Sequence, residues 1–420
     1  MATQAALVAA TKNQRERQHV AIFPRVATGY AGVLPTAYLD NAASTEPLPE
    51  VIEAVARAMR EHFANPSSLH GLGASAARAL ATAREQVAAL LHAEPAEMVF
   101  TGGGTEANAL GLVGAARAAR LRHIVVSAIE HAAVFHSARR LAEEGWQVDE
   151  VAPGPDGRVT VEAVLAAVRP ETSVVAVMLV NNEIGTLQPV ADIARAVRAL
   201  GRKIHLHVDA VQAAGLLPID VRTKGADSIA VSAHKLHGPK GVGALWLRKG
   251  KTLLPLYGGG GQERNLRSGT ENLPACVGFG VAVTKARQDG GAAAHVVELR
   301  DRLESLIFAQ VAPARPTVPL ATPRAPHIAS VLLPGLPAEP VLHALEARGV
   351  YASEGAACSS HTREQSRVQQ ALGIAANTGM LRFSLSRLTT ADDVEQAARA
   401  LALSITEVAK VVRPVVNPGR

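Results

Sequence analysis

The sequence has few cysteines and few aromatic residues, and each shortage excludes a class of protein. Two cysteines among 420 residues cannot build the disulfide framework of a small secreted domain. Aromatic residues make up only 3% of the chain, which leaves few rings on which nucleic-acid bases could stack. The net charge of +6 is spread along the chain rather than gathered in one run. Direct nucleic-acid binding is therefore not expected, and a pocket for a small anionic ligand explains the charge equally well.

Long apolar runs are also missing. The run at 173–180 ends after about eight residues, whereas a membrane-spanning helix needs roughly 20. With 48% hydrophobic residues, the chain is nevertheless too apolar to be disordered. We expect a cytoplasmic protein with no membrane partner, in a compartment where thiols stay reduced. Residues 1–36 carry four basic side chains against the single acid Glu16, so organellar targeting is the alternative.

From residue 37 onward, short Val- and Ile-rich runs alternate with Ala-, Arg- and Glu-rich stretches. This alternation predicts an α/β fold with a mostly parallel sheet. Strands are expected at 98–101, 123–127, 174–180, 204–208, 228–231 and 243–247, and helices at 48–62, 74–91, 106–120, 161–168, 190–200 and 292–311. A proline-rich stretch near 312–326 indicates a boundary. We predict a mobile N-terminal extension (1–36), a large domain (50–299) and a smaller α+β domain formed by 37–49 and 300–420.

Polar residues that follow the strands matter most, because open α/β sheets bind ligands at the carboxyl ends of their strands. Five predicted strands end in polar segments, at 102–105, 129–131, 181–183, 209–212 and 232–235. The first of these segments joins glycines to the start of a helix, where free N–H groups suit a phosphate. Ser232 and His234 could reach the same place. An ordinary glycine-rich turn is the alternative.

Lys235 and Asp209 follow two predicted strands that we expect to be neighbours. A lysine amine at a buried strand end, near other cationic groups, has the surroundings that Schiff-base chemistry requires. An acid beside it can keep a pyridinium nitrogen protonated and so strengthen pyridoxal phosphate as an electron sink. A surface lysine and a helix-capping aspartate are the alternatives, and finding both residues together favours the cofactor.

His205, His207 and Asp209 alternate along one predicted strand, so they share a face and have the chemistry of metal ligands. No second cluster of ligands follows them, and Asp209 is explained by Lys235. We therefore interpret the two histidines as ordinary strand residues and predict no metal site.

The two cysteines have different surroundings. Cys276 lies among apolar and small residues and is expected to be a core thiol. Cys358 lies in a small, polar, loop-like segment, where an exposed thiol can act as a nucleophile. An incidental surface thiol explains the local sequence of Cys358 equally well.

Several motifs occur in a fixed order along the chain. They are YLDNAAST at 38–45, NPSSLH at 65–70, TGGGTEAN at 101–108, EH at 130–131, NNEIG at 181–185, HVDAVQ at 207–212, SAHK at 232–235, RSGTEN at 267–272 and RFS at 382–384. With these motifs the chain resembles the cysteine desulfurases, relatives of the class V aminotransferases, from Tyr38 to about Val408. The resemblance implies the fold-type I pyridoxal phosphate architecture, with the cofactor bound by the large domain.

The resemblance also implies roles for single residues. Lys235 would hold pyridoxal 5′-phosphate as a Schiff base, Asp209 would pair with the pyridine nitrogen, and His131 would stack on the ring and take part in proton transfer. The phosphate and the phenolic oxygen would be bound by Gly104, Thr105, Asn182, Gln212, Ser232 and His234, and by Thr270 from the partner subunit of a homodimer. The substrate carboxylate would be bound by Asn41, Asn182 and Arg382.

In this resemblance Cys358 is the sulfur acceptor. The enzyme would convert L-cysteine to L-alanine, leave a persulfide on Cys358 and pass it to an acceptor such as an iron–sulfur scaffold protein or another thiol carrier. Glu354 stands where the family usually has a serine, and a nearby carboxylate disfavours a thiolate. A selenocysteine lyase and a non-catalytic scaffold for sulfur assembly are the alternative functions.

Overall fold

The computed structural model describes residues 36–290, 292–355 and 365–411. From Ala37 onward the chain forms one compact unit. The predicted extension, apart from Thr36, and the predicted nucleophile Cys358 lie outside the described residues. Among the described helices, none combines the length and the apolar character that a membrane crossing requires.

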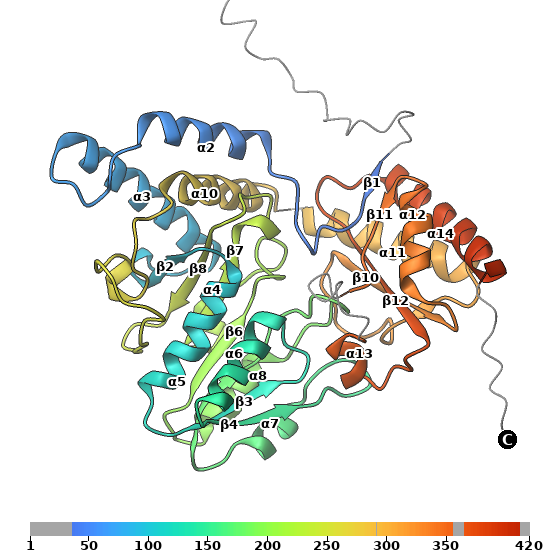
Figure 1. The fold of residues 1–420 in the computed structure, drawn as a ribbon, viewed down its shortest axis with the longest axis horizontal. Coiled ribbons are helices and arrows are strands. Elements are labelled where there is room, and N and C mark those ends of the chain that lie inside the picture. The colour runs from blue at the N-terminus through green and yellow to red at the C-terminus, as the bar shows by residue number, and fades with distance from the viewer. Residues whose placement is uncertain (1–35, 291, 356–364, 412–420) are drawn as a thin grey trace, which may run out of the picture. The chain divides into compact units, whose positions relative to one another are not determined.

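A seven-stranded sheet forms the centre of the large core (Figure 1). Its strands are, in sheet order, β2 (Met98–Thr101), β8 (Gly243–Leu247), β7 (Ser228–Ser232), β6 (His205–Asp209), β5 (Thr172–Ala176), β3 (His123–Ser127) and β4 (Gln147–Val151). Only β8 runs against its neighbours, pairing antiparallel with β2 and β7. The carboxyl ends of the other strands therefore meet at one edge, and the predicted α/β fold is confirmed.

Helices cover both faces of this sheet, because its strands are apolar on both sides. One face packs against α2 (Pro49–Glu61), α3 (Gly71–Leu90), α8 (Val190–Ala199) and α10 (Leu273–Gln288). The other face packs against α4 (Gly104–Ala109), the π-turn η2 (Leu110–Gly114), α5 (Ala115–Ala118) and α6 (Ala132–Glu143). The segments α4, η2 and α5 follow one another without a break, so a single helical run begins where β2 ends.

Two strands of the central sheet depart from the prediction by more than one residue. The strand predicted at 174–180 stops at Ala176, because the chain leaves the ladder there and Val180 instead bridges Leu187. Val177–Val180 nevertheless stay buried, and burial is what their apolar character indicated. The edge strand β4 was not predicted, because its sequence QVDEV is largely polar.

A second core contains α11 (Ala292–Gln310), α12 (Ala338–Glu346) and α14 (Ala391–Val411). These helices pack on an antiparallel sheet of β12 (Thr378–Ser384), β10 (Ile328–Pro334) and β9 (Arg315–Pro316), and on the parallel pair β1 (Ala37–Tyr38) and β11 (Val350–Tyr351). The helix α11 starts before residue 300, and its Val296 already packs in this core. The division of the chain at residue 300 stays a prediction.

Candidate active site

Lys235 and Asp209 lie at the ends of adjacent strands, as expected. Asp209 is the last residue of β6, and Lys235 ends the single 3-10 turn η3 (Ala233–Lys235) that follows β7. β6 and β7 pair in parallel, with Asp209 opposite Ala230. The loop that follows β1 links Lys235 to Arg382, because Lys235 Nζ donates to the Ala42 carbonyl and Arg382 Nη2 donates to Asp40 Oδ1.

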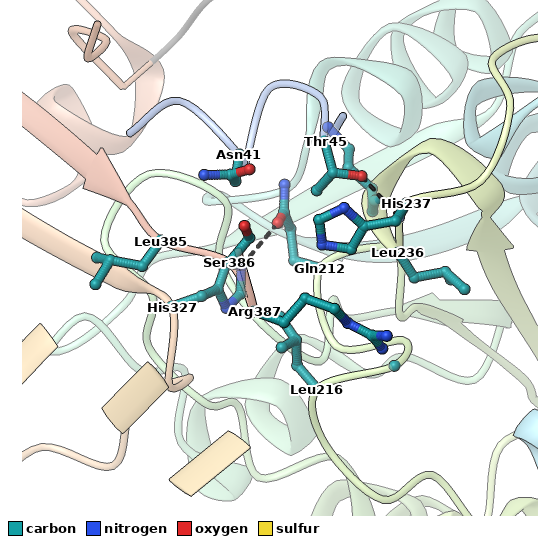
Figure 2. Close-up of a pocket in the computed structure, with 12 residues that line it drawn as sticks. Asn41, Thr45, Gln212, Leu216, Leu236, His237, His327, Leu385, Ser386 and Arg387 are labelled. Carbon is teal, nitrogen blue, oxygen red and sulfur yellow. Dashed lines mark hydrogen bonds between the residues drawn. The ribbon is translucent and has the colours of Figure 1, made fainter. Parts of the chain in front are cut away.

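The amine of Lys235 faces the loop that follows β1. Its Nζ donates to the carbonyl oxygens of Ala42 at 2.6 Å and Ala43 at 2.8 Å. Gln212 Nε2 donates to the same Ala42 carbonyl at 2.9 Å, and Gln212 Oε1 lies 3.1 Å from His327 Nε2. Figure 2 shows this Gln212–His327 pair in a pocket that Asn41 and Lys235 also line. The loop at 42–43 therefore fixes both the lysine and the glutamine.

Asp209 is almost fully buried, at 4% exposure, so its carboxylate depends on donors within the protein. Asn108 Nδ2 donates to Oδ2 at 2.7 Å, and the Val211 N–H donates to Oδ1 at 2.9 Å. Burial raises the pKa of Asp209, while His131, these two donors and Lys235 oppose that rise. An ionised carboxylate held this way is suited to bind a protonated ring nitrogen.

His131 caps the start of α6. Its Nδ1 accepts the Ala133 N–H at 3.1 Å, so the proton of a neutral ring must be on Nε2. Burial lowers the pKa of His131, which favours this neutral form. The imidazole thus offers one N–H donor of fixed direction.

The turn between β2 and α4 has the features of a phosphate site. Gly103 has φ +152° and ψ −179°, and Gly104 begins the helical run. A Cβ on Gly104 would lie 2.8 Å from Val211 Cγ2 and 3.3 Å from Ser232 Cβ, so the three residues surround one small space. Ser232 Oγ is buried and has no hydrogen-bond partner among the described residues. A buried hydroxyl without a partner beside a helix start fits an anionic group with several acceptor oxygens.

The other predicted phosphate ligands lie at different depths. His234 Nδ1 is 3.3 Å from Ser44 Oγ, and burial lowers the pKa of His234 to about 4, so its ring is neutral near pH 7. Thr105 and Thr270 are exposed. Exposure of Thr270 is compatible with the predicted role in a partner subunit, which stays a prediction.

Arg382 lies on β12 with 2% exposure and is held by segments distant in sequence. Its Nη2 donates to Asp40 Oδ1 at 2.8 Å, and its Nη1 donates to the carbonyls of Asn182 and Gly355, each at 2.8 Å. Asn41 lies close by, with Nδ2 donating to the Ser384 carbonyl at 2.8 Å. The guanidinium is thus rigidly placed, and the three predicted carboxylate-binding residues, Asn41, Asn182 and Arg382, are brought together.

Two buried glutamates accompany the site. Glu130 Oε1 accepts from Ser127 Oγ at 2.5 Å and from the Met178 N–H at 2.7 Å, and burial raises the pKa of Glu130 to about 8. Glu183 Oε2 accepts from Ser366 Oγ at 2.6 Å, and burial raises its pKa to about 7. Both carboxyls are thus held partly or fully protonated at neutral pH.

Cys276 is a core thiol, with 1% exposure and a pKa raised by burial. It matches its prediction.

Sequence reasoning did not assign roles to Asp40, Asn108 or His327. Asp40 and Asn108 belong to quoted motifs, YLDNAAST and TGGGTEAN, so a signal was present for both. His327 stands alone beside an apolar strand, and no pattern in the sequence marks it.

The chain matches the family model of the class-V aminotransferases over residues 37–397. A cysteine desulfurase from Cereibacter sphaeroides is 43% identical over 371 residues, which cover 87% of this chain and 94% of that protein. The cysteine desulfurase NifS of Azotobacter vinelandii is 38% identical over 394 residues, covering 91% of this chain and 97% of that protein.

Solved structures agree with these relatives. A NifS-like protein superposes with a TM-score of 0.82 at 34% identity, covering 89% of this chain and all (100%) of its own. The structure of SspA in complex with cysteine gives a TM-score of 0.73 at 32% identity, covering 84% and 100%.

Proposed function

The chain belongs to the cysteine desulfurases of the class-V aminotransferase family, and we propose that it works with pyridoxal 5′-phosphate and transfers sulfur from L-cysteine to Cys358. The observation that carries the proposal is the position of Lys235 and Asp209 after and at the ends of adjacent parallel strands, with Lys235 linked to Arg382 through the loop that follows β1. The names of the relatives favour cysteine over selenocysteine as the substrate.

The described residues suit this cofactor. Lys235 would hold its aldehyde, Asp209 its ring nitrogen, and Gly104 and Ser232 its phosphate, while Gln212 shares the Ala42 carbonyl with Lys235. The other cofactor-binding residues that we propose within one chain are Gln212, Asn182, Thr105 and His234. In a homodimer, Thr270 of the partner subunit would join them. When bound, the cofactor supplies the electron sink that stabilises negative charge at the substrate Cα.

The protein residues hold the substrate and move protons. Arg382, fixed by Asp40, binds the substrate carboxylate together with Asn41 and Asn182. The Lys235 amine then carries a proton to and from the substrate Cα, since no other described amine lies at the end of β7. His131 Nε2 offers the second proton position.

Sulfur transfer itself needs a thiolate, which we assign to Cys358 on the sequence alone. The Cys358 thiolate attacks the sulfur of cysteine and forms an S–S bond, while the substrate Cβ–S bond breaks. The electron pair of that bond stays on Cβ and takes up the thiol proton, so the products are alanine and a persulfide. NifS- and IscS-named relatives make iron–sulfur assembly the proposed destination of the sulfur. Transfer to an acceptor protein in the cytoplasm is part of the proposal.

Incubation with L-cysteine, followed by mass spectrometry, tests the function and the residue together. We expect one alanine per added sulfur, with the sulfur on the Cys358 peptide and none on the Cys276 peptide. Cys358→Ala should abolish persulfide formation, whereas the matched control Cys276→Ala should retain it. Sulfide release by Cys358→Ala at the parent rate would contradict the assignment.

A further inference from the structure

A line of buried polar side chains leads from Asp209 into the sheet, on the face covered by α4 and η2. Asn108 bonds Asp209, and its Oδ1 lies 3.0 Å from His207 Nε2. His207 Nδ1 lies 2.8 Å from Ser228 Oγ, which is also 2.8 Å from His205 Nε2. All five side chains are at most 8% exposed. The two histidines that the sequence marked only as strand residues are therefore connected to the acid of the site.

The strand register creates this line. Ser228 pairs with His207 across β6 and β7, and His205, His207 and Asp209 share one face of β6 because side chains alternate along a strand. Asn108 reaches the same face from α4. Within the described residues, no group of histidines, cysteines and acids is arranged to hold a metal ion. These side chains form hydrogen bonds with one another.

The helix above the line leaves space for the His207 ring. A Cβ on Gly111 would lie 2.3 Å from both Cε1 and Nδ1 of His207, so a larger residue there would collide with the imidazole. Gly111 lies in the π-turn η2, the one interruption of the helical run that begins at Gly104. Such turns often occur at functional sites. The local structure thus fixes the plane of His207.

The direction of every hydrogen bond in the line follows from its first member. An ionised Asp209 can only accept, so Asn108 presents its NH2 to Asp209 and its oxygen to His207. His207 must then carry its proton on Nε2, because burial lowers its pKa to about 3 and leaves only one ring proton. Its Nδ1 accepts the Ser228 hydroxyl proton, and Ser228 in turn accepts from Nε2 of neutral His205.

We propose that Asn108, His207 and Ser228 are positioning residues that form a one-directional hydrogen-bond relay and hold Asp209 ionised toward the cofactor ring nitrogen. The inference rests on the proposed function, in which Asp209 faces that nitrogen. Every member of the relay except Asp209 is neutral. The relay therefore gives the Asp209 carboxylate an oriented N–H donor from Asn108, without a positive charge that would compete with the cofactor ring for that carboxylate. A buried carboxylate needs such donors, since burial alone favours its protonated form.

Neutron diffraction from crystals of the deuterated holoenzyme tests the direction. We expect a deuteron on Nε2 of both His207 and His205, none on Nδ1 of His207, and the Ser228 deuteron pointing to His207. A deuteron on Nδ1 of His207 would overturn the relay, because Ser228 would then accept from His207, and the neutral His207 ring would have no proton on Nε2 to donate to Asn108.

Substitutions test the consequence for the cofactor. His207→Leu removes the donor to Asn108, whereas His207→Gln keeps an N–H near the position of Nε2. We expect His207→Leu to weaken pyridoxal phosphate binding about three- to tenfold, the usual cost of losing one hydrogen bond, and to shift the absorbance of the bound cofactor. His207→Gln should recover most of the affinity and the spectrum. Equal affinity and spectra in His207→Leu and the parent protein would overturn the proposal.

A comparison of Ser228→Ala with Ser173→Ala distinguishes the effect of breaking the relay from the effect of losing any buried hydroxyl group. Both serines are buried in the central sheet, at 0% and 3% exposure, but Ser173 bonds the His123 carbonyl, away from Asp209. We expect Ser228→Ala to weaken cofactor binding several-fold with kcat reduced more than KM is changed, and Ser173→Ala to leave both unaltered. Equal effects of the two variants on cofactor affinity would count against the relay.

The deuteron positions and the cofactor affinities do not depend on the desulfurase reaction. If the parent protein binds the cofactor and shows the predicted deuterons and affinity losses but forms no alanine from cysteine, the relay stands and the proposed function fails. If alanine forms and the deuterons are misplaced, the function stands and the relay fails.

Discussion

Two charged residues of the site, Asp209 and Arg382, are held in opposite ways. Asp209 ends a central strand and is bonded by groups of the same sheet and its covering helix, Val211 and Asn108. Arg382 is bonded by Asp40, 342 residues away, and by the carbonyl of Asn182, 200 residues away. On the cofactor side, the acid is thus held within the central sheet and its covering helix, whereas the arginine on the substrate side is held only when distant segments have come together.

This difference indicates a division of labour. A position built into one sheet stays fixed through the reaction, which suits the tuning of a cofactor. A position built from several segments links substrate binding to the packing of those segments. We expect changes on the cofactor side to act on kcat, and changes on the substrate side to act on stability and KM.

The largest effect is expected at Lys235. Lys235→Ala removes the amine that moves the Cα proton, so alanine formation should fall by on the order of 10²- to 10⁴-fold. Lys240→Ala is the control, because Lys240 is exposed and lies five positions further along the same segment. The rate of alanine release from L-cysteine measures both variants. If Lys235→Ala kept the parent rate, Lys235 would not be a catalytic residue on the cofactor side.

Asp40→Ala should chiefly reduce stability. It leaves the buried Arg382 guanidinium without its carboxylate, a change that costs about 3 kcal/mol in comparable buried pairs. The control is Asp192→Ala, which breaks an exposed pair with Arg195 and should cost at most about 0.5 kcal/mol. Urea unfolding measures both losses, and similar losses would show that Arg382 does not depend on Asp40.

Arg382→Lys and Asp209→Asn should separate the two sides kinetically. Lysine keeps the charge but loses the planar fork, so the KM for L-cysteine should rise roughly tenfold or more while kcat changes less. Asparagine keeps the shape of Asp209 but not its charge, so kcat should fall while KM changes less. The opposite pattern in steady-state kinetics would reverse the assignment of the two sides.

The last prediction concerns Glu130 and pH. Its carboxyl has a folded pKa of about 8 and an unfolded pKa near 4.3, so the folded state binds the extra proton between these values. Stability should therefore fall as pH rises from about 4.3 to about 8, with a slope of at most about 1.4 kcal/mol per pH unit for this one group. Glu130→Gln should reduce the slope of the free energy of unfolding against pH, measured by urea unfolding at several pH values. An unchanged slope would indicate that Glu183, and not Glu130, causes the pH dependence.

The sequence predicted the cofactor side better than the substrate side, for a physical reason. Parallel strands bring their carboxyl ends to one edge, so strand prediction was enough to place Asp209 and Lys235 side by side. No local rule brings Asp40 to Arg382, because that contact depends on how β1 and β12 pack in the second core. His327 is a similar case, reaching Gln212 from the start of β10.

The sequence also could not predict which partner donates in each hydrogen bond of the relay. The pattern His205, His207, Asp209 indicated a shared face, but a shared face is equally compatible with metal ligands, core histidines and a relay. Ser228 decides between them, and its place beside His207 depends on the register of β7 against β6. The Cys358 assignment rests on the sequence throughout.

The contact between Gly111 and His207 also limits how this protein can be redesigned. Replacing a helical glycine with alanine commonly raises stability by about 0.4–1 kcal/mol, which makes every glycine in a helix a target for thermostabilisation. At Gly111 the added methyl would occupy the space of the imidazole, 2.3 Å from two of its atoms. At Gly71, on the first turn of α3, the same methyl would meet nothing within 4 Å. A stabilised variant can therefore accept alanine at Gly71 but must keep Gly111 to keep its active site.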